Sequence, residues 1–191
     1  MTDKTLETGL IGGVEKRDIK IAEYDPQWPA LFEKHAKIIA EAIGGAACRI
    51  EHIGSTSVPG LAAKPIVDIL VVVKDAGDES VYLRQLEAAG YLLRVREPNW
   101  YEHRMFRTPE RDVHVHIHSD GCPEIRRNLT FRDRLRKNSD DRKRYEQTKR
   151  QLATQDWPDM NAYAQAKTQV IGDILAASQA AGEDQHSLER Q

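Results

Sequence analysis

The sequence predicts one α+β (α/β) domain, with a mixed β-sheet, flanking helices and a helical C-terminal layer. Three patterns lead to this fold class. Ile66–Val73 is a nearly continuous β-branched run, which is typical of a strand covered on both faces. Asp112–His118 alternates polar and apolar residues, as a half-buried strand does. From about Pro123 to Ala177 the apolar residues recur with helical spacing.

The elements before the central strand begin with a helix. Asp25-Pro26 predicts its start, with Asp as the cap and Pro in the first turn. The residues that follow place an apolar face on this helix, so we expect it to pack on the sheet: Leu31, Phe32, Ala36, Ile39 and Ala40. Arg49–Ile53 then predicts a short strand.

After the central strand the elements continue to alternate. A helix is expected over Glu79–Ala89, ending at Gly90. Strands are expected over Tyr91–Val95 and Trp100–Arg107, and the second of these turns through Thr108–Arg111 into Asp112–His118. The sequence therefore supplies at least five candidate strands for one sheet.

The C-terminal half restarts its helices twice, at Ser139-Asp140-Asp141 and at Trp157-Pro158-Asp159. Both ends of the chain are polar and have little to bury. We therefore expect a flexible segment over residues 1–17, a domain over 18–177 and a flexible tail over 178–191.

Composition narrows the class of protein. The chain has 191 residues, 40% of them hydrophobic and 30% charged, which suits one globular domain. Its net charge of -2 gives no strong drive toward nucleic acid, and its apolar runs are too short to cross a bilayer. Two cysteines make no disulfide framework, and no leader pattern opens the chain. These features predict a cytoplasmic protein without a membrane partner.

Asp68 is the first residue that could carry chemistry. A carboxylate inside an apolar strand is costly unless it is paired, hydrogen-bonded or bound to a metal. The upstream segment Glu51–Gly60 holds Gly54-Ser55-Thr56-Ser57, whose small residues would let a polyphosphate approach backbone N–H groups. The structural alternative is a polar loop before a strand whose Asp reaches solvent.

The histidines of the last strand form a second candidate. Asp112, His114, His116 and His118 share one face of an extended strand, and neighbours on that face lie roughly 6.5–7 Å apart. Two of the imidazoles could therefore ligate one ion with suitable rotamers. The alternative is a strand with its polar side chains toward solvent.

The helical half is rich in arginine and lysine, which would suit anion binding. Acidic residues are interleaved with them, so most of these side chains are expected to form a solvated helix face.

Several motifs together resemble the GrpB family, also called UPF0157, over about Ile21–Ala177. They are Tyr24-Asp25-Pro26-Gln27-Trp28-Pro29, nearly all of Glu51–Asp68, His114-Val115-His116, Phe131-Arg132-Asp133-Arg134-Leu135-Arg136, and Tyr163 with Ala166-Lys167. The long Glu51–Asp68 motif is the most specific of them. The resemblance implies a nucleotidyltransferase-like core.

In nucleotidyltransferases a Gly-Ser turn precedes a strand with two carboxylates one residue apart, and a third lies on a neighbouring strand. Together these carboxylates hold two divalent ions. Gly54-Ser55 matches the turn and Asp68 the first carboxylate, but Leu70 stands where the second would be. Where the third would fall, the chain offers His114 or His116.

The departure from the family's pattern leaves the metal site open. One Asp with two His implies a site for a single divalent ion, Mg²⁺, Mn²⁺ or Zn²⁺, and imidazole favours the latter two. Alternatively His116 is a general base toward a hydroxyl or amine. Glu51 and His52 could supply a missing ligand, whereas His118 lies outside the motif.

The resulting hypothesis is a nucleotidyltransferase that takes a nucleoside triphosphate and an acceptor of unspecified type. Asp68 and His116 would be catalytic, with Asp68, His114 and His116 on the metal. The residues expected to bind the nucleotide are Gly54, Ser55, Thr56, Ser57, Lys64, Arg104 and Lys167, with Arg107 as a further contact to phosphate or acceptor.

The rival hypothesis is a non-catalytic accessory module that binds a nucleotide or a CoA-type ligand. Domains that resemble this one occur fused to dephospho-CoA kinase, and the missing second carboxylate favours it. A role in protein folding is suggested only by the family's name.

Overall fold

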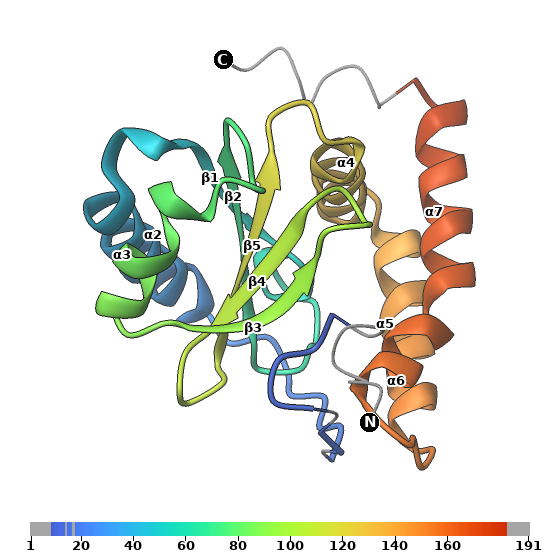
Figure 1. Ribbon diagram of the computed structural model, residues 1–191. Coiled ribbons are helices and arrows are strands. Elements are labelled where there is room, and N and C mark those ends of the chain that lie inside the picture. Colours follow the sequence, from blue (N-terminus) through green and yellow to red (C-terminus); the bar gives the residue numbers. More distant parts are fainter. Residues whose placement is uncertain (1–8, 14, 17, 183–191) are drawn as a thin grey trace.

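A five-stranded mixed sheet forms the centre of the molecule (Figure 1). The computed structural model describes residues 9–13, 15–16 and 18–182. The strands are β1 (Ala47–Ile53), β2 (Val67–Val73), β3 (Leu92–Glu97), β4 (His103–Arg107) and β5 (Val113–Ser119). Their order is β1-β2-β5-β4-β3, with β2 and β5 parallel and the other neighbouring pairs antiparallel.

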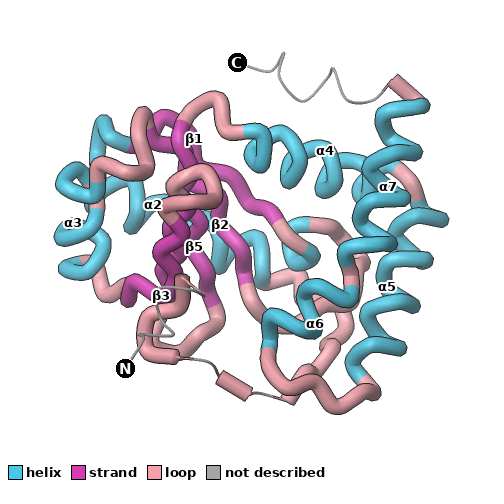
Figure 2. The backbone as a smooth tube through the Cα atoms, turned by 45° about the vertical axis from the view of Figure 1, so that its right-hand side comes forward, coloured by secondary structure: helices cyan, strands magenta, loops and turns pink. Residues whose placement is uncertain are grey.

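Helices lie on both faces of this sheet. Figures 1 and 2 show α2 (Trp28–Ile43) and α3 (Leu83–Ala88) on one side and the C-terminal helices on the other. The C-terminal helices are α4 (Pro123–Lys137), α5 (Ser139–Ala153), α6 (Met160–Ala166) and α7 (Thr168–Ala180). The predicted α+β class, with flanking helices and a C-terminal helical layer, is confirmed.

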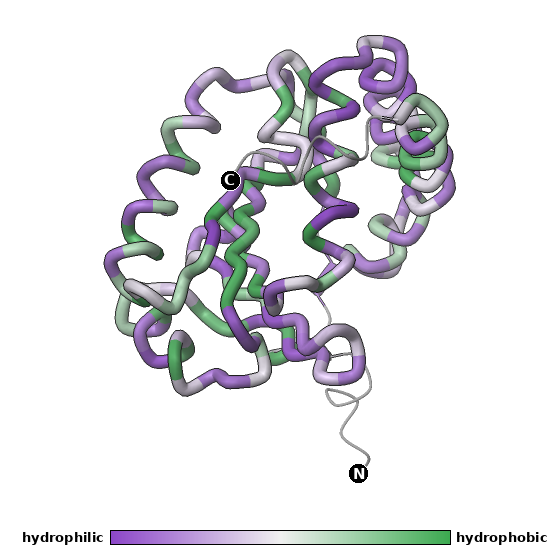
Figure 3. The backbone as a smooth tube through the Cα atoms, turned by 90° about the horizontal axis from the view of Figure 1, so that it is seen from above, coloured by the Kyte–Doolittle hydropathy of each residue, from purple (hydrophilic) through white to green (hydrophobic). Residues whose placement is uncertain are grey.

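Apolar side chains of the strands fill the space between these layers, and in Figure 3 hydrophobic residues colour the strands at the centre. On the α2 side Ile39 and Leu86 pack against sheet residues such as Phe106, and all three are fully buried. On the other side Ile125 and Leu129 of α4 join a smaller cluster with strand residues. This second cluster covers β1 and β2 and leaves the neighbouring part of that face to polar residues.

The first helix begins later than Asp25-Pro26 suggests. The Asp25 carboxylate accepts a hydrogen bond from the N–H of Gln27 at 2.8 Å, which closes a turn ahead of the helix. Gln27 is the N-cap and Pro29 stands in the first helical turn. The signal was therefore real, but it belongs to the turn that leads into the helix.

The helix expected over Glu79–Ala89 is divided. The Asp78 side chain accepts from the N–H of Ser80 and caps a short 3-10 helix, Glu79–Val81. Tyr82, with φ -144° and ψ -25°, separates it from α3. The strand expected from Trp100 also begins later, at His103, because Tyr101 and Glu102 both have φ 53° and form a turn.

Both predicted restarts in the helical half are confirmed. Asn138 caps α5 by accepting from the N–H groups of Asp140 and Asp141, and Asp159 caps α6 in the same way. None of the helices in the described part of the chain is long and apolar enough to cross a membrane.

The ends are more ordered than predicted where the structure describes them. Leu10 forms a β-bridge with Val95, and Glu15 pairs with Arg107, so this segment packs on the sheet. At the other end α7 continues through a buried Ser178 to Ala180. The flexibility expected for residues 1–8 and 183–191 lies outside the described residues.

Candidate functional site

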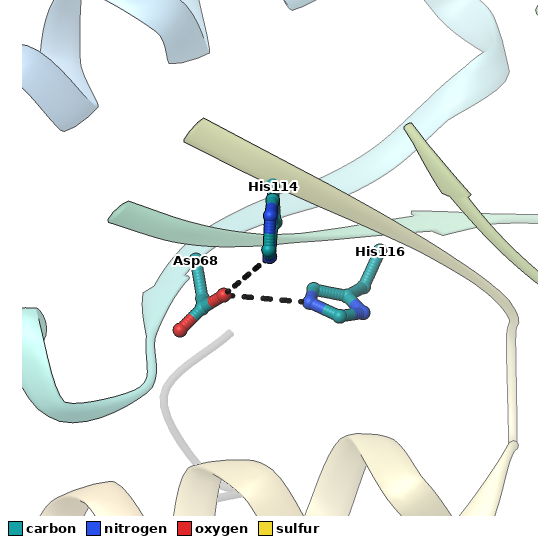
Figure 4. A group of neighbouring side chains, drawn as sticks. All are labelled: Asp68, His114 and His116. Atoms are coloured by element: carbon teal, nitrogen blue, oxygen red, sulfur yellow. Dashed lines mark ion pairs between the residues drawn. The ribbon is translucent and has the colours of Figure 1, made fainter. Parts of the chain in front are cut away.

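Strand pairing brings Asp68, His114 and His116 together. In the parallel β2–β5 pair, Asp68 lies opposite His114 and Leu70 opposite His116. The Asp68 Oδ1 atom is 3.6 Å from His114 Nδ1 and 3.6 Å from His116 Nε2 (Figure 4). Among the described residues these three form the group of potential metal ligands, with ligand atoms within 4.8 Å of one another.

Gly54 makes room for the carboxylate. Its φ of 70° and ψ of -174° fall in a region that is open essentially to glycine. A Cβ at this position would lie 2.3 Å from Asp68 Oδ2. The glycine of the predicted Gly-Ser turn therefore acts by letting the turn and the β2 carboxylate approach each other.

The donor set fits a divalent cation. Ligands at Zn²⁺ distances of about 2.0–2.2 Å in a tetrahedron lie about 3.4 Å apart, close to the 3.6 Å seen here. Burial raises the pKa of Asp68, but the imidazoles of His114 and His116 outweigh it, so this pKa lies below its ordinary value. The carboxylate is thus held ionised, as a metal ligand must be.

Leu70 explains why the site has a single carboxylate on β2. Its side chain is fully buried in the cluster with Ile125 and Leu129 of α4. A carboxylate there would be desolvated without a partner. The described residues therefore supply one carboxylate and two imidazoles at this end of the sheet, and a site for a single ion stays a prediction.

Two further residues extend the site behind His116. The His103 Nε2 atom is 3.1 Å from His116 Nδ1, and His103 Nδ1 is 2.7 Å from Glu97 Oε2. Burial lowers the pKa of His103, although Glu97 acts in the opposite direction. Trp100, 42% exposed, lies edge-on to His103 at a centroid distance of 5.2 Å.

A cavity of about 430 Å³ separates this polar face of the sheet from the C-terminal helices. Three lysines line it together with Asp68 and the histidines. Lys64 and Lys167 lie over the ring of Tyr163, with Nζ 5.2 and 4.7 Å from the centroid. Lys149 lies 4.8 Å from the centroid of Tyr145 and donates to the Ala62 carbonyl at 2.5 Å.

Two of these lysines, Lys149 and Lys167, have a pKa below that of an ordinary lysine. Burial, helped by the charge of Lys167, lowers the pKa of Lys149 to about 7. Burial, helped by the charge of Lys64, lowers the pKa of Lys167 to about 8. An anion in the cavity would favour the charged form of both lysines and so oppose both pKa shifts.

The turn after Gly54 contributes less than predicted. Ser55 lines the cavity and hydrogen-bonds with Tyr145. Thr56 is buried and donates to the Ile66 carbonyl, while the Ser57 hydroxyl donates to the Gly54 carbonyl at 2.6 Å. The hydroxyls of Thr56 and Ser57 therefore stabilise the turn, and the expected nucleotide binding by these two residues stays a prediction.

The prediction for Arg104 is wrong. Arg104 pairs in register with Ile117, and residues alternate along both strands. Its side chain therefore faces the α3 side of the sheet, away from the face that carries His116. Its guanidinium is 6% exposed and pairs with Glu79 at 2.6 Å and Glu102 at 3.1 Å. Arg107 is engaged as well, because both its terminal nitrogens donate to Glu15.

The other candidate ligands have different partners. Glu51 is held by Arg49 and Arg132, with ion-pair distances of 2.8 and 2.7 Å. His52 points to the opposite face, where it stacks on Phe32. His118 lines the cavity but stacks on a neighbouring histidine, and burial lowers its pKa to about 3.

Sequence reasoning missed Glu97, His103, Lys149, Tyr145 and Tyr163 as parts of the site. Tyr145 and Lys149 have an i,i+4 spacing, which places them on one helix face. Nothing in that spacing says that the face meets the cavity. Arg134 is an exception to the solvated helix face expected in the helical half, since it is 11% exposed and pairs with Asp141 at 2.6 Å.

Two distant likenesses accompany the nearer relatives. A dephospho-CoA kinase of Mycolicibacterium paratuberculosis is 28% identical over 180 residues, and the match covers 81% of this chain and 44% of the kinase. The Cid1 structure in complex with its short product ApU aligns at 14% identity with a TM-score of 0.43, a likeness too small to support a conclusion about this chain.

The nearer matches are consistent with one another. The family model described as GrpB protein matches residues 18–177. UPF0157 proteins of Halalkalibacterium halodurans and Streptomyces coelicolor are 46% and 51% identical, covering 94% and 90% of this chain and 93% and 90% of their own lengths. The crystal structure of conserved protein GrpB from Enterococcus faecalis aligns at 34% identity and a TM-score of 0.76, over 86% of this chain and 99% of that one. The chain therefore belongs to the GrpB family.

Proposed function

We propose that this protein is a metal-dependent nucleotidyltransferase, which transfers a nucleotidyl group from a nucleoside triphosphate to an acceptor hydroxyl or amine. The observation that carries the proposal is one cavity with two unlike walls. Asp68 and the two histidines offer a cation site on one wall, and the three lysines offer positive charge on the other. A metal-bound polyphosphate needs both kinds of wall.

Each wall has a role in this proposal. Asp68, His114 and His116 hold one divalent ion, which would neutralise charge on the triphosphate. Lys149 of α5 and Lys167 at the end of α6 hold the phosphates from the helical side, and Lys64 holds them from the segment that leads into β2. Ser55 and the backbone of the Gly54 turn lie beside Asp68.

The reaction balances without a further reactant. The acceptor oxygen or nitrogen bonds to the α-phosphorus, the bond to the bridging oxygen of the β-phosphate breaks, and pyrophosphate leaves. The acceptor's proton passes to a base. Because His116 Nδ1 is engaged by His103, His116 offers one nitrogen toward Asp68 and is either ligand or base, not both at once.

Calorimetric titration of metal-stripped protein tests the proposal. The four nucleoside triphosphates are each titrated with Mg²⁺, Mn²⁺ or Zn²⁺. We expect metal-dependent binding that Asp68→Asn abolishes while the domain stays folded. Asp75→Asn is the matched control, because Asp75 is exposed just beyond the opposite end of β2. Equal binding by folded Asp68→Asn would refute the assignment.

A second candidate function is the non-catalytic module for a nucleotide or CoA-type ligand. Leu70 favours it, since the buried leucine removes a second metal position. The partial match to a dephospho-CoA kinase is consistent with it. Under this alternative a phosphate-rich ligand binds without metal, loses affinity in Lys167→Met, and keeps it in Asp68→Asn. No nucleotide turnover would accompany that binding.

A further inference from the structure

Glu97, His103 and His116 form a chain of hydrogen bonds that ends at the proposed metal position. The rings of His103 and His116 are nearly coplanar, with 14° between their planes and centroids 5.4 Å apart. Their nearest nitrogens are 3.1 Å apart, so the nitrogens lie between the ring centres and the rings meet edge to edge. This is the geometry of an N–H···N hydrogen bond in the ring plane.

The direction of the chain follows from its outer end. An ionised Glu97 can only accept, so the proton at 2.7 Å belongs to His103 Nδ1. Neutral His103 then has a lone pair on Nε2, which accepts from His116 Nδ1–H. Neutral His116 in turn carries its lone pair on Nε2, the atom that faces Asp68 Oδ1 at 3.6 Å.

Two acceptors therefore face each other at the end of the chain. The Nε2 lone pair of His116 and the Asp68 carboxylate repel unless a proton or a metal cation lies between them. Without the chain, His116 would instead place its proton on Nε2 and donate toward Asp68. In that tautomer the proton on Nε2 would leave no lone pair there to bind a metal ion.

We infer that Glu97 and His103 are positioning residues, which fix His116 as the Nδ1–H tautomer and so keep its Nε2 available for a divalent cation. The inference rests on the proposed function for the metal site itself, and it adds two residues that do not touch the metal. Partners behind a ligating histidine orient the ring and raise its basicity. Here a second histidine stands between the carboxylate and the ligand.

The first test needs no metal and no substrate. Nitrogen-15 spectra of the imidazoles, recorded on metal-free protein at neutral pH, report which ring nitrogen of His116 carries the proton. We expect the Nδ1–H form in the wild type and a shift to the Nε2–H form in His103→Phe, which keeps an aromatic ring beside Trp100. Nε2–H in the wild type would overturn the inference.

The second test measures the affinity for Co²⁺ or Zn²⁺ alone. We expect affinity to fall about 10–100-fold in His103→Phe, as is usual when such a partner is lost. His103→Gln should recover part of the loss, because an amide can accept from His116 and donate to Glu97. Unfolding curves establish that each variant is folded.

If changes at the buried His103 prevent folding, Glu97→Ala tests the same inference at a more exposed residue. Its side chain is 35% exposed, and its loss should release the His116 tautomer and weaken metal binding. Glu102→Ala is the control, because Glu102 belongs to the next turn and pairs with Arg104 on the other face. Equal metal affinity in wild type and Glu97→Ala would refute the inference alone. Failure of the wild type to bind any metal would refute the proposed function, and the tautomer measurement would still decide the positioning role.

Discussion

Replacement of Gly54 by alanine should damage both stability and the proposed metal site. The native φ of 70° with ψ of -174° costs a residue with a Cβ about 1–3 kcal/mol. The new Cβ would also lie 2.3 Å from Asp68 Oδ2 and 3.1 Å from Asp68 Cγ. Relief of such a contact costs about 1–3 kcal/mol more, so we expect a total loss of about 2–6 kcal/mol.

Gly60→Ala separates the two contributions. Gly60 also has a positive φ, 76°, but nothing lies within 4 Å of a Cβ placed there. It should lose about 1–2 kcal/mol from backbone strain and bind metal as the wild type does. Denaturant unfolding gives the free energies, and each kcal/mol should lower Tm by about 2–4 °C in a chain of this size.

The metal affinity gives the second readout for Gly54→Ala. Titration with Co²⁺ or Zn²⁺ should show a marked loss, because the carboxylate must move away from the new Cβ and so leave its present position beside His114 and His116. The double variant Gly54→Ala/Asp68→Ala should be more stable than additivity predicts, since the 2.3 Å contact with Asp68 Oδ2 is absent from it and only the 3.1 Å contact with the Cβ of residue 68 remains. If Gly54→Ala matches Gly60→Ala in both stability and metal affinity, the steric argument is refuted.

Three further predictions concern buried polar groups. The pKa of Lys149 is about 7 in the folded state and near 10.5 in the unfolded state. Burial of its charge therefore destabilises the fold most below pH 7, and this cost declines as the pH rises from 7 to 10.5. The gain in unfolding free energy of Lys149→Met over the wild type should therefore be larger at pH 6 than at pH 9. Within the described residues the Tyr163 hydroxyl is buried without a hydrogen-bond partner, so Tyr163→Phe should leave the unfolding free energy unchanged or raise it by about 1–3 kcal/mol, and a fall of that size would contradict the reasoning. Arg104→Met should lower the unfolding free energy by about 1.5–3 kcal/mol, since Glu79 loses one charged hydrogen-bond partner and keeps Arg96, while calorimetry should find metal and triphosphate affinity unchanged.

Local patterns predicted the strands well where one face or both faces are buried. The apolar run around Asp68 and the alternation of Val113–His118 each report burial over a few residues, and both became paired strands. Turn chemistry was less informative. Asp25, predicted as a helix cap, closes the turn ahead of the helix instead, because a cap residue alone does not say how many residues separate the turn from the helix.

The sequence by itself determined that Asp68 is a costly carboxylate in a buried strand and that His114, His116 and His118 share a face, because both follow from the two-residue period of one strand. Only the tertiary structure decided which of these side chains meet. Parallel pairing of β2 with β5 set Asp68 opposite His114, and the β4 register turned His103 toward the site and Arg104 away from it. The β2–β5 register depends on contacts between residues 46 apart in the sequence, such as Val67 with Val113, and a shift of one residue would reverse every face. The lysine wall was decided in the same way, since the periodicity of a helix shows which residues share a face but not what that face will cover.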